Sequence, residues 1–376
     1  MLILYLYLIK KEMKNILIFY LICILNTSCG NDDNQFRNQE LYFPPLEGNQ
    51  WETISTESLS WNDTKISELL NFLETNNTRA FIILKDGKIV VEEYWGDNIL
   101  GTANFNQNTI WYWASAGKTL TATLTGIAQE NGLLNINDPT SNYLGSGWTS
   151  LISEKENLIT VKDQLSMTTG LDYEVDNLDC TTANCLTYKA DAGTQWYYHN
   201  APYTLLRDVI ESATQKDYNQ YTNEKIENKI GMNGEWIANG SFNNVYWSTP
   251  RDMARFGLLM LNEGVWNETP VLTDSNYYND MVNSSQSLNP SYGYLWWLNG
   301  KDSVILPSLD FALNIQLADN APSDLVAGIG KNGQFVEFVP SQNLVVIRMG
   351  EAPDNSLVPI EFHNEMWAEI SEVTTE

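Results

Sequence analysis

The sequence predicts an α+β fold: one antiparallel sheet flanked by helices and interrupted by an inserted, mostly helical domain. Strand-like segments lie near both ends of the 376-residue chain, at 80–94 and again between 292 and 350. The region between them, about 135–245, has mainly the pattern of helix and loop. We therefore expect the N- and C-terminal strands to share one sheet and the central region to be a helical insertion.

The composition excludes several classes of protein. Hydrophobic residues make up 43% of the chain and charged residues 18%, which is too apolar for a disordered protein and ample for a large core. The formal net charge of -26 argues against a nucleic-acid partner, because phosphate binding needs clustered lysine and arginine. Nothing in the sequence indicates an oligomeric state.

The first residues have the pattern of an export signal. Met13, the expected start, and Lys14 precede an apolar run over 16–25 that is too short to span a bilayer. Small residues before Cys29 and polar ones after it resemble a bacterial lipobox. We expect a signal peptide over 1–29, lipidation at Cys29 as the chain's only contact with a membrane, and a place in the bacterial cell envelope, lipid-anchored or periplasmic. The alternative is cleavage by ordinary signal peptidase, with Cys29 incidental.

The next segment, 30–50, is polar and contains two prolines, which suits a tether between an anchor and a folded body. We expect one folded domain over 51–376. It has no internal repeat, and no run after the signal is long and apolar enough to cross a membrane.

The folded domain is expected to begin with a helix over 66–74, where apolar residues have helical spacing. Two β-rich runs then flank Asp86-Gly87, a strong hairpin signal for 80–96. A second helix runs from 118 to about Gly132 and places its apolar residues on one face: Leu120, Leu124 and Ile127.

The remaining pattern alternates between helices and strands. Helices are predicted over 201–215, 218–232, 250–264 and 360–373, and strands over 292–300, 325–340 and 343–350.

Two cysteines lie in the segment LDCTTANCLTY. In an exported chain the short gap between Cys180 and Cys185 permits a disulfide that closes a small loop, which is what we expect. The alternative is two free thiols. Two cysteines with no histidine nearby make a poor zinc site, and the chain has only two histidines, so we expect no metal and no other cofactor.

The stretch YWASAGKTLT contains Ser115, followed three residues later by Lys118. On a helix these positions share a face, so the lysine amine can reach the serine hydroxyl. A serine becomes nucleophilic when a base removes its proton, and a buried lysine with a lowered pKa can be that base. The alternative is a capping serine beside a solvated lysine.

Two further segments carry candidate chemistry. In GTQWYYHNAPYTLL, Tyr198 and Asn200 follow a Gly-Thr turn and a short aromatic strand, at the start of a helix. There Tyr198 could relay protons with the lysine, and Asn200 could hold the lysine or a substrate carbonyl. In GIGKNGQFVEFVP, glycines would let a strand edge approach the substrate, with a backbone N–H completing an oxyanion hole with that of Ser115. The alternative is an ordinary glycine-bearing strand.

Taken in this order, the segments resemble the serine β-lactamase and penicillin-binding-protein-like hydrolases, in the branch with class C β-lactamases, esterases and nylon-oligomer (aminohexanoate-dimer) hydrolases. The resemblance covers about residues 75–350. It is carried by four stretches in the order of that family: SAGKTLTATLTGIAQENGLLNINDPTSNYL, ITVKDQLSMTTGLDY, YYHNAPYTLLRDVIE and TPRDMARFGLLMLNEGVW.

The resemblance implies a β-lactamase/transpeptidase-like fold and a set of roles. Ser115 would be the acylated nucleophile, Lys118 and Tyr198 the proton-shuttling pair, and Asn200 a residue that positions the substrate. Counting back from Pro340 puts Gly328-Ile329-Gly330 where relatives have Lys-Thr-Gly or His-x-Gly, with Lys331-Asn332-Gly333 as a misaligned decoy. Ile329 and Gly330 would then bind substrate through backbone N–H groups.

We therefore expect an exported serine hydrolase that cleaves a small-molecule ester or amide through an acyl-enzyme on Ser115. Because the third motif lacks a lysine or histidine, recognition of a β-lactam carboxylate is not expected. The alternatives are a β-lactamase or D-amino-acid peptidase and, from another class, a non-catalytic envelope protein that binds peptide or glycan.

The sequence offers further histidines and aromatic residues near these motifs. A Ser-His-Asp mechanism is not expected, because His363 has the position of a surface residue on the last helix, and His199 would point away from its neighbours Tyr198 and Asn200. Tyr292, Trp296 and Trp297 are candidate aromatics for a cleft, with at least one tryptophan expected in the core.

Overall fold

The computed structural model describes residues 41–239 and 243–374. The predicted signal peptide, Cys29 and the first part of the predicted tether lie outside these residues. Among the residues that the structure describes, no helix combines the length and the apolar character needed to cross a membrane.

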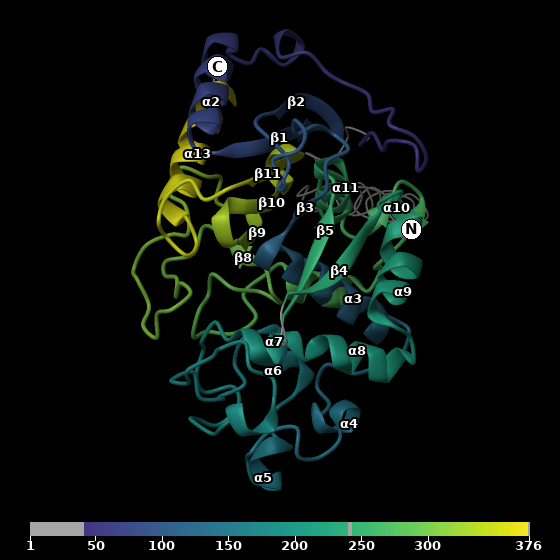
Figure 1. The fold of residues 1–376 in the computed structure, drawn as a ribbon, viewed down its shortest axis with the longest axis vertical. Helices are drawn as coiled ribbons and strands as arrows, with labels where there is room; N and C mark the ends of the chain where they lie inside the picture. The colour runs from purple at the N-terminus through teal and green to yellow at the C-terminus, as the bar shows by residue number, and fades with distance from the viewer. Residues whose placement is uncertain (1–40, 240–242, 375–376) are drawn as a thin grey trace, which may run out of the picture. The chain divides into compact units, whose positions relative to one another are not determined.

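The central sheet has the strand order β2-β1-β11-β10-β9-β8, and every neighbouring pair is antiparallel. The strands are β1 (Thr78–Lys85), β2 (Lys88–Tyr94), β8 (Trp297–Leu298), β9 (Val326–Gly330), β10 (Gln334–Val339) and β11 (Leu344–Gly350). The pairing of β1 with β11 joins the two ends of the chain in one sheet (Figure 1). The predicted α+β architecture is confirmed.

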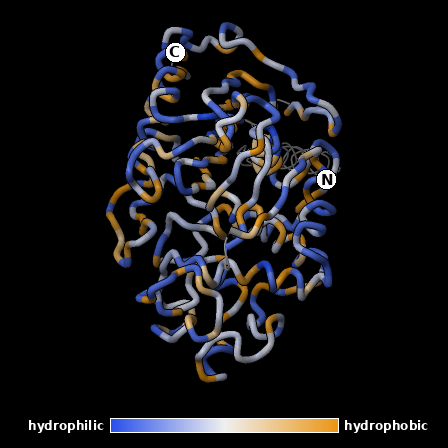
Figure 2. Tube along the Cα trace, viewed as in Figure 1, coloured by the Kyte–Doolittle hydropathy of each residue, from blue (hydrophilic) through white to orange (hydrophobic). Residues whose placement is uncertain are grey.

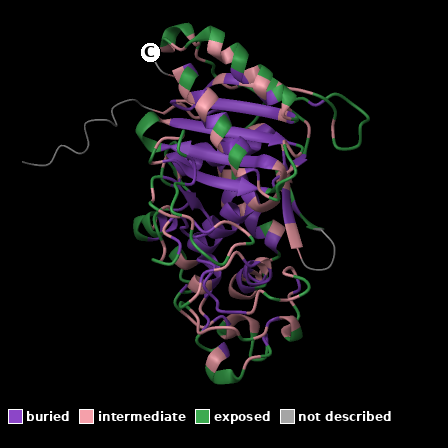
Figure 3. Ribbon diagram, turned by 90° about the vertical axis from the view of Figure 1, so that its left-hand side faces the viewer, coloured by how far each residue is buried: buried purple, intermediate pink, exposed green. Residues whose placement is uncertain are grey.

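The hairpin of β1 and β2 turns at Asp86 and Gly87, both with positive φ, 52° and 81°. Asp and Gly tolerate this left-handed backbone, so the two-residue turn sets the register of the pair. The inner strands are buried on both faces and are therefore mainly apolar, with Glu337 on β10 and Arg348 on β11 as buried charged residues (Figure 3).

Helices cover both faces of the sheet. On one face α2 (Asp63–Thr75) and α13 (Ile360–Thr374) lie side by side, with the rings of Phe72 and Phe362 stacked at 5.4 Å (Figure 1). On the other face α11 (Pro250–Leu261) comes so close that a Cβ on its Gly257 would lie 2.6 Å from Val345 Cγ1. Beside α11 runs α3 (Lys118–Glu130), whose predicted apolar face, Leu120, Leu124 and Ile127, is buried.

The insertion follows α3 and contains short helices joined by long loops. These are α4 (Ser141–Leu144), α5 (Ser153–Glu156), α6 (Val161–Leu165), α7 (Asn200–Thr204), α8 (Leu206–Thr214), α9 (Tyr218–Thr222) and α10 (Asn228–Ile230), with a 3-10 turn over Ala183–Cys185 and a π-turn over Asn223–Glu227. It has a second, smaller apolar cluster around Trp148, Leu186 and Leu205. Figure 2 shows hydrophobic segments in both this region and the sheet region.

The predicted end of the helical insertion, about 245, is wrong. Strands β4 (Gly234–Asn239) and β5 (Asn243–Ser248) form a hairpin, and β3 (Trp111–Tyr112) extends it to a three-stranded sheet. The sequence carried the signal: Asn239-Gly240 is a typical hairpin step between two runs rich in aromatic and β-branched residues.

The predicted tether is wrong for its second half, because residues 41–50 pack on the folded body. The backbone N–H of Tyr42 donates to Asp86 O at 3.0 Å, and Arg255 donates to Pro45 O at 2.7 Å. A polar, proline-containing segment looks like a linker in sequence, but its carbonyl groups here satisfy buried arginine donors.

Two further predictions are corrected. Within the strand expected over 292–300, the structure has a strand only at β8. Most of YGYLWWLNG instead packs as a buried, bent loop. His363 is not a surface residue: it is fully buried on the inner face of α13, where its ring contacts the carboxylate of Glu337 on β10. Trp367 donates to the same carboxylate at 2.9 Å.

The remaining elements are short. They are the 3-10 turns Glu57–Leu59, Ala114–Gly117 (η2), Lys331–Gly333 (η5) and Pro340–Gln342, the strands β6 (Val265–Trp266) and β7 (Thr269–Pro270), and the helix α12 (Ser275–Met281).

Candidate active site

Ser115 lies in the 3-10 turn η2, directly before α3. The residue before it, Ala114, has a φ of 47°, a left-handed conformation that costs a non-glycine residue about 1 kcal/mol or more. Strain of this kind persists only where the surroundings fix the backbone. Here it turns Ser115 toward a cavity at the junction of the sheet and the insertion.

Gly330 allows the sheet edge to touch this turn. A Cβ at Gly330 would lie 2.6 Å from Trp113 O and 3.1 Å from Ser115 N, so no larger residue fits without displacement. A Cβ at Gly328 would lie on the same side of the strand, 2.9 Å from Thr119 Cγ2. The side chain of Ile329 is buried on the other side of the strand. The predicted third motif thus lies against Ser115 through its glycines.

Lys118 is the first residue of α3 and is 2% exposed. Its Nζ lies 3.4 Å from Ser115 Oγ, as the three-residue spacing predicts. Burial lowers the pKa of Lys118 to about 7, although the negative charge of Asp179 acts in the opposite direction. The neutral amine that a base requires is therefore accessible near neutral pH.

Burial raises the pKa of Tyr198 well above its usual value, although the neighbouring Ser115 side chain acts in the opposite direction. Its phenol is therefore protonated at neutral pH. The ring stacks on Trp297 at 5.9 Å, and Lys118 Nζ lies 5.3 Å from the ring centroid. The predicted aromatic strand is absent: residues 195–199 are extended but pair with no strand among the described residues.

Tyr203 is a member of the site that the sequence analysis missed. Its ring centroid lies 3.9 Å from Lys118 Nζ, closer than that of Tyr198, and its hydroxyl approaches Thr121 Oγ1 at 3.5 Å. It lies one helical turn after Asn200, so its position on the predicted helix was the signal that could have found it.

Asn200 is the first residue of α7 and lines the same cavity. Its amide oxygen is buried and has no hydrogen-bond partner in the part of the chain that the structure describes. The oxygen therefore does not accept from Lys118, one of its two predicted roles. A buried acceptor without a partner costs about 1–3 kcal/mol, which a substrate N–H would recover.

The cavity has a volume of about 580 Å³, within the roughly 300–1,000 Å³ typical of small-molecule sites. Ser115, Lys118, Tyr198 and Asn200 all line it. It also takes in Lys331 and Asn332, from the segment that the sequence analysis set aside as a decoy. The strand assignment holds, because β9 ends at Gly330, but the turn that follows brings these two side chains to the site.

Buried Arg348 on β11 holds this turn in place. Its guanidinium donates at 2.8 Å to both Asn332 O and Gly333 O, and at 3.0 Å to Thr78 Oγ1. Asn332, with a φ of 63°, in turn donates to Tyr112 OH at 2.8 Å. The cavity wall beside Ser115 is thus fixed from the centre of the sheet.

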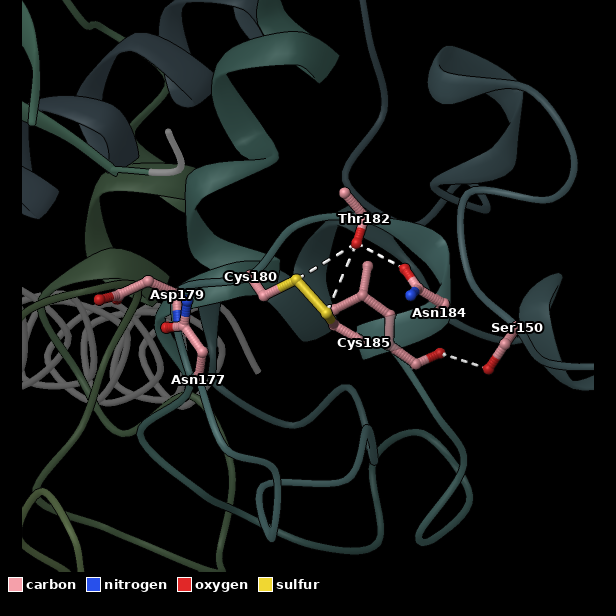
Figure 4. The surroundings of a disulfide bond; sticks show 8 residues. Ser150, Asn177, Asp179, Cys180, Thr182, Asn184 and Cys185 are labelled. Carbon is pink, nitrogen blue, oxygen red and sulfur yellow. Dashed lines mark hydrogen bonds between the residues drawn. A yellow bond between two sulfur atoms is a disulfide. The ribbon is translucent and has the colours of Figure 1, made fainter. Parts of the chain in front are cut away.

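Cys180 and Cys185 are joined by a disulfide with an S–S distance of 2.07 Å. Thr182, inside the loop it closes, hydrogen-bonds Asn184 at 2.6 Å (Figure 4). Asp179 lies next to Cys180 in this view and lines the cavity, with one carboxylate oxygen buried and unpartnered among the described residues. The disulfide therefore anchors the segment that brings a negative charge near Lys118.

His199 is buried and does not line the cavity, whereas its neighbours do, as the extended backbone predicts. Burial lowers the pKa of His199 to about 4, so it is neutral at pH 7. Of the candidate aromatics, Tyr292 and Trp297 pack around Tyr198, and Trp296 belongs to the core. Within 41–239 and 243–374, no cluster of three or more His, Cys, Asp or Glu could hold a metal.

The arrangement has the parts that acyl transfer needs. A hydroxyl lies next to an amine whose pKa is lowered and a phenol whose pKa is raised. Backbone N–H groups belong to the same turn, and the hydroxyl-bearing Ser115 lines the cavity. The hydroxyl and the N–H groups come from η2, the amine from α3 and the phenol from the segment before α7.

Comparison with known proteins agrees with this geometry. The family model "Beta-lactamase" matches residues 77–356. An uncharacterized protein of Alkalihalophilus pseudofirmus is 25% identical over 324 residues, covering 78% of this chain and 88% of its own. The 6-aminohexanoate-dimer hydrolase of Paenarthrobacter ureafaciens is 23% identical over 332 residues, covering 77% of each chain.

Among solved structures, a protein of Bacillus anthracis assigned as a 6-aminohexanoate-dimer hydrolase superposes with a TM-score of 0.66 at 18% identity, covering 88% of this chain and 89% of its own. At this identity the likeness shows the fold. The chain belongs to the Beta-lactamase family and is a serine hydrolase of the β-lactamase and nylon-oligomer hydrolase type.

Proposed function

We propose that the protein hydrolyses an ester or linear amide of a small molecule through an acyl-enzyme on Ser115, with Lys118 as the base. One observation carries the proposal. Lys118 is buried, its pKa is about 7, and its Nζ lies 3.4 Å from the hydroxyl of Ser115, which lines a cavity. An ordinary surface lysine would be charged and could not accept the proton of the serine.

The proposed reaction has two halves. Ser115 Oγ attacks the substrate carbonyl and passes its proton to Lys118, while the N–H groups of Ser115 and of the Ile329–Gly330 strand stabilise the oxyanion. The protonated pair of Lys118 and Tyr198 then gives the proton to the leaving alcohol or amine, which departs. Water attacks the acyl-enzyme by the same route, releasing a carboxylic acid and restoring the serine.

Asn200, at the start of α7, would also bind the substrate. Its unpartnered amide oxygen can accept an N–H of an amide substrate, which an ester does not have. An amide would therefore gain a contact here, and the 6-aminohexanoate-dimer hydrolase among the relatives is, by name, an enzyme that acts on such a compound.

A β-lactam or another substrate with a carboxylate is a second candidate. The expected exclusion depended on the absence of a cation from Gly328-Ile329-Gly330. Lys331, which follows that motif and lines the cavity, offers an ammonium group for such a carboxylate.

A side-by-side assay tests these candidates. A p-nitrophenyl ester, the 6-aminohexanoate dimer, a D-amino-acid peptide and nitrocefin are compared by kcat/KM. We expect turnover of the ester or the dimer, with nitrocefin slower by about tenfold or more. Lys331→Met should lower nitrocefin hydrolysis and change the neutral ester little. If nitrocefin is the fastest substrate and depends on Lys331, the second candidate replaces the first.

We further propose that the chain is exported and held in the bacterial envelope by a lipid on Cys29. The support is the signal-like run that ends in a lipobox-like segment. In a bacterial host the full chain should partition with membranes, and Cys29→Ala should move it to the soluble exported fraction. Soluble wild-type protein in the periplasm would contradict the anchor and leave the hydrolase proposal standing.

A further inference from the structure

Three exposed aliphatic side chains gather at the opening of the cavity that contains Ser115. Ile99 is 49% exposed, Ile237 44% and Leu357 55%, and all three line the cavity. They come from the loop after β2, from β4 and from the loop before α13, segments that the fold brings together from distant parts of the chain.

Single exposed aliphatic residues are ordinary on a protein surface, but a group of them around a cavity indicates that the cavity binds an apolar group. Four more apolar residues line the same space, together with polar ones such as Asn243, Asn244 and Ser308: Leu178, Val245, Pro307 and Val358. Tyr112 and Trp247 add two aromatic rings to the lining, with centroids 5.5 Å apart and ring planes tilted by 59°. Apolar side chains thus make up a large part of the lining of the cavity that also contains Ser115.

We propose that the substrate's acyl group is an unbranched apolar chain, and that Ile99, Ile237 and Leu357 determine specificity by covering it. This inference rests on the proposed function and names the substrate class. Covering the chain removes apolar surface from water on both partners, which is the source of the selectivity.

The charge of the protein fits an uncharged acyl chain. With a net charge of -26, the chain repels anions at long range but not a neutral ester or amide. The product of hydrolysis is a carboxylate, and the same field then favours its departure.

The first test is a series of p-nitrophenyl esters with acetyl, butyryl, hexanoyl and octanoyl groups, assayed below their micelle-forming concentrations. A fully buried methylene favours binding by roughly fourfold, and at this half-open mouth we expect about twofold for each. The value of kcat/KM should thus rise by roughly sixtyfold over the six methylenes from acetyl to octanoyl. A matched series of alkyl acetates, which lengthens the leaving group instead, should rise less.

The second test assigns the effect to the cavity mouth with matched controls. Ile99→Ser and Leu357→Ser should each lower the octanoyl-to-acetyl ratio of kcat/KM by about threefold or more. Ile315 is 49% exposed, like Ile99, and Leu158 is 55% exposed, like Leu357, but neither lines the cavity. Ile315→Ser and Leu158→Ser should therefore leave the ratio unchanged.

The outcomes separate this inference from the proposed function. A flat or falling acyl series with clear turnover of the acetyl ester overturns the inference and leaves the hydrolase proposal intact, as does a larger response to the leaving group. Cavity and control variants that behave alike overturn the assignment to these residues. No turnover of any ester or amide would overturn both proposals.

Discussion

Replacing Ser115 with alanine is expected to abolish hydrolysis, lowering kcat/KM by about 10⁴-fold or more, because it removes the hydroxyl that lies beside Lys118 and forms the proposed acyl-enzyme. The change removes one half-buried hydroxyl next to Lys118 and adds no atom, so the fold should survive. Turnover of a p-nitrophenyl ester and labelling by a fluorophosphonate probe measure the effect. The label should be lost with the hydroxyl.

Ser212→Ala is the matched control. This serine is also half-buried and donates a hydrogen bond, to Tyr143 O at 2.7 Å, but it lies on α8 and does not line the cavity. This variant should retain activity. The fluorophosphonate probe should label no residue in it other than Ser115. Normal turnover by Ser115→Ala with an unchanged melting temperature would rule out the acyl-enzyme, and a wild type that never labels would favour the non-catalytic binding protein.

The architecture of the sheet was predictable because its signals are local. Asp86-Gly87 identifies a hairpin, and the apolar runs of β10 and β11 identify buried strands. The register that joins β1 to β11 has no local signal, and only the position of strands at both chain ends suggested it. The hairpin of β4 and β5 was missed because its short strands adjoin helical segments on both sides.

The site was predictable where its residues share one element. Ser115 and Lys118 are neighbours on a turn and a helix, so their spacing was enough. Asp179 and Lys331 were missed or set aside because loops position them: a disulfide-closed segment for the first, and a turn fixed by Arg348 for the second. His363 was misassigned because its partner, Glu337, is a charged residue that the sequence gives no reason to bury.

The activity of the wild-type enzyme should depend on the protonation of Lys118. Burial holds its pKa near 7, far below the usual 10.5, so the neutral amine that can accept a proton predominates above that pH. We expect kcat/KM to fall with decreasing pH as one proton binds, with a midpoint near pH 7, and to level off on the alkaline side. Tyr198 does not add a step there, because its raised pKa keeps the phenol protonated.

Lys118→Arg should lower kcat/KM by about 10²- to 10⁴-fold at every pH, because a guanidinium remains protonated and cannot be the base. Asp179→Asn supplies the sharper test, since it leaves the lysine in place. The carboxylate of Asp179 raises the pKa of Lys118, so removing its charge should move the acid limb of the profile to lower pH. The shift must appear in kcat/KM for a neutral ester, where no substrate charge changes. Two results would show that another group accepts the proton of Ser115. One is an acid limb of the pH profile that does not move in Asp179→Asn; the other is near-normal activity with the same acid limb in Lys118→Arg.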